Sequence, residues 1–210
     1  MIYAENILLC IAVPLAVTLF FIKGDARRFM AALLIGMVLC LISAYITGFL
    51  STLSELSAED ISIYISPVVE ELIKLLPLLF ILFVFDPSDD KIFLFAVALG
   101  AGFATLENCC YILTSGAGRL SYILIRGLAV GVMHVVSLLE LAFGIVLIRR
   151  FRIVSFAGIL GALSLSMTFH GLYNLLVSKH GAFSYIGYAM PLAVGAVLYF
   201  AFRRFMARSD

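Results

Sequence analysis

The chain divides into seven long apolar runs, and these runs constrain its fold more than any other feature. A helix needs about 20 residues to cross the hydrocarbon core of a bilayer, and each run reaches that length. Backbone N–H and C=O groups find no water in lipid, so only helices or closed barrels can cross it. The runs are continuous rather than alternating, which favours helices. Charged residues make up 13% of the chain, against roughly 25% in soluble domains, so we expect no soluble domain.

We therefore expect an all-α, polytopic membrane helix bundle that forms a single domain over residues 1–210. The expected transmembrane helices are 3–22, 29–49, 63–85, 91–114, 122–148, 153–178 and 183–205. The segment 51–62 between the second and third helices carries three acidic residues and is expected to form a short interfacial helix outside the membrane. Net charge is +1, so there is no basic field to attract nucleic acid.

Basic residues predict the orientation, because cytoplasmic loops are enriched in Lys and Arg. Ten of them fall on one side of the seven-helix arrangement: Lys23, Arg27, Arg28, Lys91, Arg149, Arg150, Arg152, Arg203, Arg204 and Arg208. Only Arg119 and Lys179 fall in loops on the other side. We therefore place the N-terminus outside and the C-terminus in the cytoplasm.

Ionisable side chains at membrane depth cost several kcal/mol, so each one needs a reason. Glu70, Glu107 and His170 come from three different expected helices. At 1.5 Å per residue they lie about 10 to 12 Å below the outer ends of those helices. His134 lies about 18 Å below the outer end of a fourth helix. Structural polar residues scattered at random would not agree in depth, so a shared polar pocket in the outer half of the bilayer is expected.

Spacing within the helices predicts which side chains meet. Glu70 and Lys74 are four residues apart, and Glu71 and Lys74 are three apart, so Lys74 can pair with either acid. Adjacent helical residues point about 100° apart, so one acid can face the pocket while the other is held by its neighbours. His170 and Asn174 share a helix face, so Asn174 can orient the imidazole or bind substrate.

Each of these residues also has a purely structural interpretation. The acids and lysine of the expected third helix could form a structural ion pair. Glu107 and Asn108 could supply hydrogen bonds between helices, and a single membrane histidine often serves only packing. Glu140 lies far from the others and is expected to form a local pair or an interfacial group. Arg126 lies near the outer surface, where it either extends to the headgroups or binds a substrate carbonyl or carboxylate.

Four sequence segments resemble a known family. They are EELIK (Glu70 to Lys74), GFATLEN (Gly102 to Asn108), His134, and FHGLYN (Phe169 to Asn174). In this order and spacing they resemble the PrsW family of intramembrane proteases. The related CAAX prenyl endopeptidases and bacteriocin-immunity proteins carry EExxxR and FxxxH, where this chain has EExxK and FxxxE. That difference favours the PrsW branch and argues against a prenylated substrate.

The resemblance implies a multi-pass protease of the bacterial cell membrane, with its catalytic helices in about 63–178. Family members cut the extracytoplasmic part of a membrane-anchored anti-sigma factor and so start a stress response. The expected partners are therefore a single-span membrane protein substrate and the lipid bilayer.

Peptide hydrolysis needs an activated water, a stabilised oxyanion and a proton for the leaving amine. The residues expected to carry it are Glu70, Glu71, Lys74, Glu107, His134, His170 and Asn174. Either Glu70 or Glu71 is the general base. A zinc ion bound by Glu107, His134 and His170 would match a known catalytic ligand set. A metal-free route, with both histidines and Asn174 around the oxyanion, stays equally open.

Two rival functions predict different behaviour. In a secondary transporter the acids and histidines would relay protons or ions, but such proteins have inverted halves with matching broken helices, which are not found here. A non-catalytic membrane scaffold or immunity protein would keep the fold and lack hydrolysis.

Overall fold

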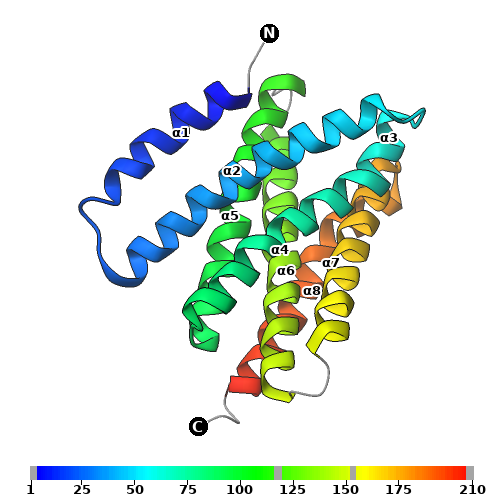
Figure 1. Ribbon diagram of the computed structural model, residues 1–210. Coiled ribbons are helices and arrows are strands. Elements are labelled where there is room, and N and C mark those ends of the chain that lie inside the picture. Colours follow the sequence, from blue (N-terminus) through cyan, green and yellow to red (C-terminus); the bar gives the residue numbers. More distant parts are fainter. Residues whose placement is uncertain (1–3, 116–119, 152–154, 207–210) are drawn as a thin grey trace.

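The computed structural model describes residues 4–115, 120–151 and 155–206, and these ranges consist of helices and short connections with no strand (Figure 1). In chain order the elements are α1 (Ala4–Thr18), α2 (Gly24–Thr52), α3 (Ala58–Asp60), the π-helix η1 (Ile61–Ile65), α4 (Ser66–Phe85), α5 (Asp89–Ser115), α6 (Leu120–Phe151), α7 (Ser155–Ser178) and α8 (Ala182–Met206). The expected all-α bundle is therefore confirmed.

Five of the described helices are long and apolar enough to cross a membrane: α2, α5, α6, α7 and α8. Helix α1 has 15 residues, fewer than a span requires. Helix α4 has 20 residues and is strongly apolar, but it carries three charged residues, Glu70, Glu71 and Lys74, and is not among the five. The count of seven spans and the orientation of the termini stay predictions. Arg119, Arg152 and Arg208, which enter the orientation argument, lie outside the described residues.

The segment expected to form a short interfacial helix contains α3, which leads directly into the third expected span, and its place relative to the membrane stays a prediction. Ser57 caps α3, its Oγ accepting a hydrogen bond from the backbone N–H of Asp60 at 3.1 Å. The chain then passes without a break through η1 into α4. Single π turns occur frequently at functional sites. Here the π-helix η1 ends directly before Ser66, the first residue of α4, the helix that carries both acids.

Helix α5 lies in the middle of the bundle, between α2 and α6 (Figure 1). Glycines let it approach both neighbours closely. A side chain at Gly102 would meet the backbone of Leu33 in α2, and one at Gly100 would meet the backbone of His134 in α6. Small residues at such crossings are typical of membrane helix packing. The close approach of α5 and α6 brings Glu107 and His134 together.

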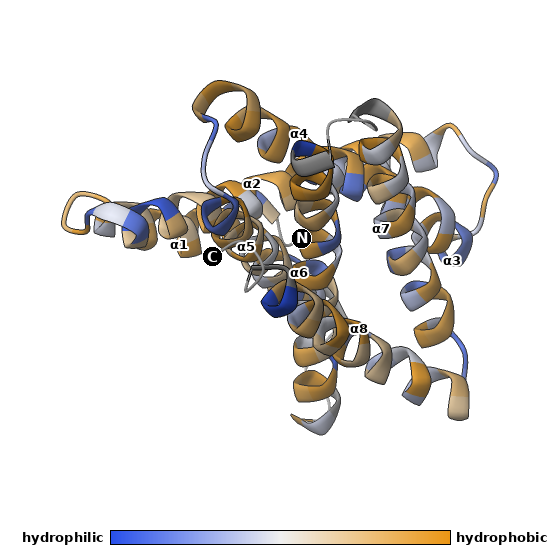
Figure 2. Cartoon of the chain, turned by 90° about the horizontal axis from the view of Figure 1, so that it is seen from below, coloured by the Kyte–Doolittle hydropathy of each residue, from blue (hydrophilic) through white to orange (hydrophobic). Residues whose placement is uncertain are grey.

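Many of the hydrophilic residues, blue in Figure 2, lie at turns and helix ends, whereas the helix bodies are largely apolar. Many large apolar side chains are exposed, among them Leu76, Phe80 and Phe83 of α4. Exposed apolar side chains on helix bodies fit a lipid environment. A few strongly polar residues occur inside the bundle, where Glu71, Lys74, His134 and His170 are buried.

Candidate active site

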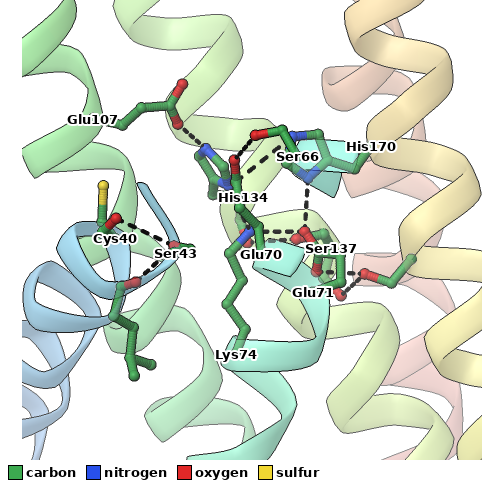
Figure 3. A network of polar contacts seen from close by, with 12 residues as sticks. Cys40, Ser43, Ser66, Glu70, Glu71, Lys74, Glu107, His134, Ser137 and His170 are labelled. Carbon is green, nitrogen blue, oxygen red and sulfur yellow. Dashed lines mark hydrogen bonds and ion pairs between the residues drawn. The ribbon is translucent and has the colours of Figure 1, made fainter. Parts of the chain in front are cut away.

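The buried polar residues meet where α4 faces α6 and α7 (Figure 3). Helix α4 supplies Glu70, Glu71 and Lys74, and α5 supplies Glu107. His134 comes from α6, and His170 comes from α7. Glu71, Lys74 and His134 have exposed fractions of 0%, and His170 has 2%. The expected convergence of acids and imidazoles from four helices is therefore found.

Glu71 is fixed by three donors. Its Oε1 accepts from Lys74 Nζ at 2.7 Å and from His170 Nδ1–H at 2.8 Å. Its Oε2 accepts from the hydroxyl of Ser166 at 2.8 Å. These three bonds engage both carboxylate oxygens of Glu71. Glu71 therefore serves to hold Lys74 and His170 in place, and it has little capacity left to receive a proton.

Lys74 connects the two acids to His134. Its Nζ lies 2.8 Å from His134 Nδ1 and 3.8 Å from Glu70 Oε2. An ammonium can only donate, so Nδ1 of His134 accepts and the proton of the neutral ring is assigned to Nε2. That Nε2–H then donates to Glu107 Oε2, which it contacts. Lys74 also lies 4.2 Å from the ring centroid of Phe103, a cation–π contact.

Glu70 has one uncommitted oxygen. Its Oε1 accepts a hydrogen bond from Ser66 Oγ at 2.7 Å. Its Oε2 is buried and has no hydrogen-bond partner, although it lies 3.9 Å from His170 Nε2. A buried carboxylate oxygen without a partner costs free energy, and such an atom in a native site calls for a ligand, a water or an ion. Of the two acids, Glu70 is the one free to react.

Glu107 forms the outer edge of the cluster. Its side chain is 33% exposed, and its Oε1 lies 3.6 Å from Arg126 Nη2. Arg126 is 17% exposed, and its guanidinium lies 3.3 Å from the ring centroid of Tyr111. Arg126 therefore points to the site rather than only to the membrane surface.

Two expected residues lie apart from this cluster. The amide of Asn174 donates to the carbonyl of Ser62 in the π turn at 2.8 Å, and so connects α7 to η1. Glu140 is 6% exposed and its Oε2 has no hydrogen-bond partner among the described residues. The expected local pair is therefore not found among the described residues, and an interfacial position for Glu140 stays a prediction.

Sequence reasoning missed the two serines that hold the acids. Ser66 precedes Glu70 by four residues, and Ser166 precedes His170 by four. Each therefore lies on the same helix face as a site residue. That spacing was a usable signal, but a serine in a membrane helix more often bonds to its own backbone, as Ser43 does with the carbonyl of Leu39.

The cluster could hold a metal ion. Glu70, His134 and His170 each offer a ligand atom, and these atoms lie within 4.8 Å of one another. Two imidazoles and a carboxylate form a known catalytic zinc set. The unpartnered Oε2 of Glu70 supports the fit, as does the bond from His170 Nδ1 to Glu71, which leaves Nε2 available. Sequence reasoning named Glu107 as the third ligand, but this grouping contains Glu70 instead.

Membrane-spanning helices around a buried carboxylate–imidazole site define a class: integral membrane proteins with the groups needed to activate water inside the bundle. The chain matches the model of the PrsW family intramembrane metalloproteases over residues 25–202. That match covers most of the chain, so the protein belongs to this family and is an intramembrane protease. Neither a curated protein nor a solved structure matches the chain.

Proposed function

We propose that the protein hydrolyses a peptide bond of a single-span membrane protein near the extracytoplasmic face of the bacterial cell membrane. The observation that carries this proposal is the asymmetry of the two acids. Glu71 is held by three donors, whereas Glu70 presents a buried, unpartnered Oε2 beside His170. An acid free to take a proton, next to an acid that fixes the surrounding cations, suits hydrolysis with an activated water.

Without a metal, Glu70 is the general base. Its carboxylate takes a proton from a water molecule, and the resulting hydroxide adds to the carbonyl carbon of the substrate. His170, protonated and oriented by Glu71, donates from Nε2 to the developing oxyanion. Glu70 then returns the proton to the nitrogen of the leaving amine as the C–N bond breaks.

With a metal, Glu70, His134 and His170 are the residues that would hold it. A zinc ion supplies a Lewis acid and lowers the pKa of a bound water. In that route Glu70 would be a ligand, and the proton would be accepted by Glu107, whose side chain is 33% exposed at the edge of the cluster. Glu71 keeps its orienting role toward His170 in both routes. To bind the metal, His134 would have to give up its contact with Lys74 or with Glu107.

The substrate we propose is a membrane-anchored anti-sigma factor, cut on its extracytoplasmic side at the start of a stress response. The depth of the site in the expected outer half of the bilayer and the family membership support this choice. The catalytic unit we propose is a single domain over residues 1–210, with the reacting groups on α4 to α7.

Cleavage of a single-span substrate by the purified protein in lipid vesicles tests this proposal. Wild type should cut it, and Glu70→Gln should abolish cutting under either route. Loss of cutting on chelation, reversed by added zinc, would assign the metal route; cutting that survives chelation would assign Glu70 as the base. An active Glu70→Gln variant would overturn the proposal. Ion flux by wild type without any cleavage would support the transporter instead.

A further inference from the structure

Access to the buried cluster is uneven. The side chains of Glu107 and Arg126 are 33% and 17% exposed, whereas those of Glu71 and Lys74 are 0% exposed. The side chain of Glu70, itself a reacting group, is 14% exposed, so the Glu107 edge is the most exposed part of the cluster. The polar groups along this edge should recognise whatever chemical group the substrate presents.

Arg126 has donors to spare at this edge. Its guanidinium rests on the face of Tyr111, and its distance of 3.6 Å from Glu107 Oε1 is too long for a good hydrogen bond. Its Nε is buried and has no hydrogen-bond partner. A guanidinium carries five N–H donors, and the Nε–H of Arg126 is one that is unfilled here. Turning it toward a ligand would break no strong bond.

Asn108 offers the complementary group. Its Nδ2 donates to the carbonyl of Gly127, the residue that follows Arg126, at 3.4 Å. That bond brings the amide of Asn108 next to the part of α6 that carries Arg126. The Oδ1 of Asn108 has no hydrogen-bond partner. An unfilled acceptor and an unfilled donor therefore occur at one place beside Glu107.

We propose that Arg126 and Asn108 bind the main chain of the substrate beside the bond that is cut. In this subsite Arg126 donates to a peptide carbonyl and Asn108 Oδ1 accepts from a peptide N–H. This assignment rests on the proposed function and specifies that the substrate of the protease is held through its main-chain groups.

The charges favour a peptide group over an acidic side chain. The carboxylate of Glu107 balances the charge of Arg126, so the edge has no net positive charge to attract a second carboxylate. A peptide group has no net charge and carries one donor and one acceptor. In a helix both are already bonded, so they can reach this subsite only where the substrate is extended. The ligand is thus an unwound segment rather than an intact membrane helix.

Binding of a fluorescent substrate segment in detergent micelles tests this assignment. The measurement is made in the Glu70→Gln background so that no cleavage interferes. Arg126→Ala and Asn108→Ala should each weaken binding about tenfold, the effect of one lost hydrogen bond to a charged or buried group. Arg126→Lys keeps the positive charge but lacks the planar guanidinium with its several N–H donors, so it should bind more tightly than Arg126→Ala and more weakly than wild type. Arg28→Ala, which removes an exposed arginine that pairs with Asp25 in the first turn of α2, is the matched control and should bind normally.

Substrates with single main-chain esters identify the group that is bound. Each ester replaces the N–H of one amide outside the scissile bond with an oxygen atom. At one position the ester substrate should bind wild type more weakly than the parent peptide does, whereas Asn108→Ala should bind the two equally. Equal losses for both proteins at every position would overturn the Asn108 assignment. Unchanged binding by Arg126→Ala would overturn the Arg126 assignment. Absence of cleavage by wild type would instead count against the proposed function, which keeps the two failures distinct.

Discussion

Lys74 should be the residue whose loss destabilises the folded protein most among the charged side chains. Its ammonium is fully buried and contacts Glu71 Oε1 at 2.7 Å and His134 Nδ1 at 2.8 Å. Replacing it by Met keeps the length of the side chain but leaves Glu71 as a buried anion without its cation. Removing one partner of a buried ion pair costs about 3–5 kcal/mol of the free energy of unfolding.

Equilibrium unfolding in mixed detergent and SDS micelles, followed by circular dichroism, measures this loss. Lys74→Met should lower the unfolding free energy by the amount above, whereas Lys91→Met, at an exposed position, should change it by less than about 0.5 kcal/mol. The double variant Lys74→Met with Glu71→Gln removes both charges. It should therefore be more stable than the sum of the single losses predicts, by about 1–3 kcal/mol. Additive losses would show that Lys74 and Glu71 are not coupled, and would refute the reasoning.

Three further predictions concern other parts of the molecule. Lys179 and Ser178 donate hydrogen bonds to Glu59, which holds the pKa of Glu59 below its ordinary value of 4.5. These bonds therefore stabilise the folded protein above pH 4.5, and this stabilisation is lost as the pH falls through the lower pKa that Glu59 has in the folded protein. The melting temperature of Glu59→Gln should therefore lie slightly below wild type at neutral pH and match it in strong acid. Gly102→Ala places a methyl against the backbone of α2 and should yield little monodisperse protein on size-exclusion chromatography, whereas Gly48→Ala, with open space around it, should behave as wild type. Ser166→Ala removes one donor from the fixed acid of α4 and should lower kcat about tenfold with substrate affinity unchanged; an unchanged kcat would show that this hydroxyl is not needed.

The sequence was most informative where the argument stayed within one helix or depended only on depth. Long apolar runs predicted an all-helical membrane protein, and the spacing of Glu70, Glu71 and Lys74 predicted that the lysine would reach both acids. The lysine does so unequally, at 2.7 Å from Glu71 and 3.8 Å from Glu70. The agreement in depth of Glu70, Glu107 and His170 predicted their meeting.

Rotation between helices was not predictable in the same way. Helical periodicity says which residues share a face, but the face that meets a neighbour depends on close packing such as that of Gly100 against α6. For this reason the sequence could not distinguish the fixed Glu71 from the free Glu70, and it grouped Glu107 rather than Glu70 with the histidines. Asn174 shares a face with His170, yet the nearby π turn offers it a free carbonyl, and the amide bonds there instead.

Hydrolysis of a single-span substrate in water enriched in heavy oxygen is the most direct test of the central claim, that Glu70 and the surrounding residues activate water inside the bundle. Mass spectrometry of the N-terminal product should find one heavy oxygen atom from solvent in its new carboxyl group. The labelled product should be absent with Glu70→Gln. Formation of the same labelled product by that variant at the wild-type rate, or no product from wild type, would contradict the account.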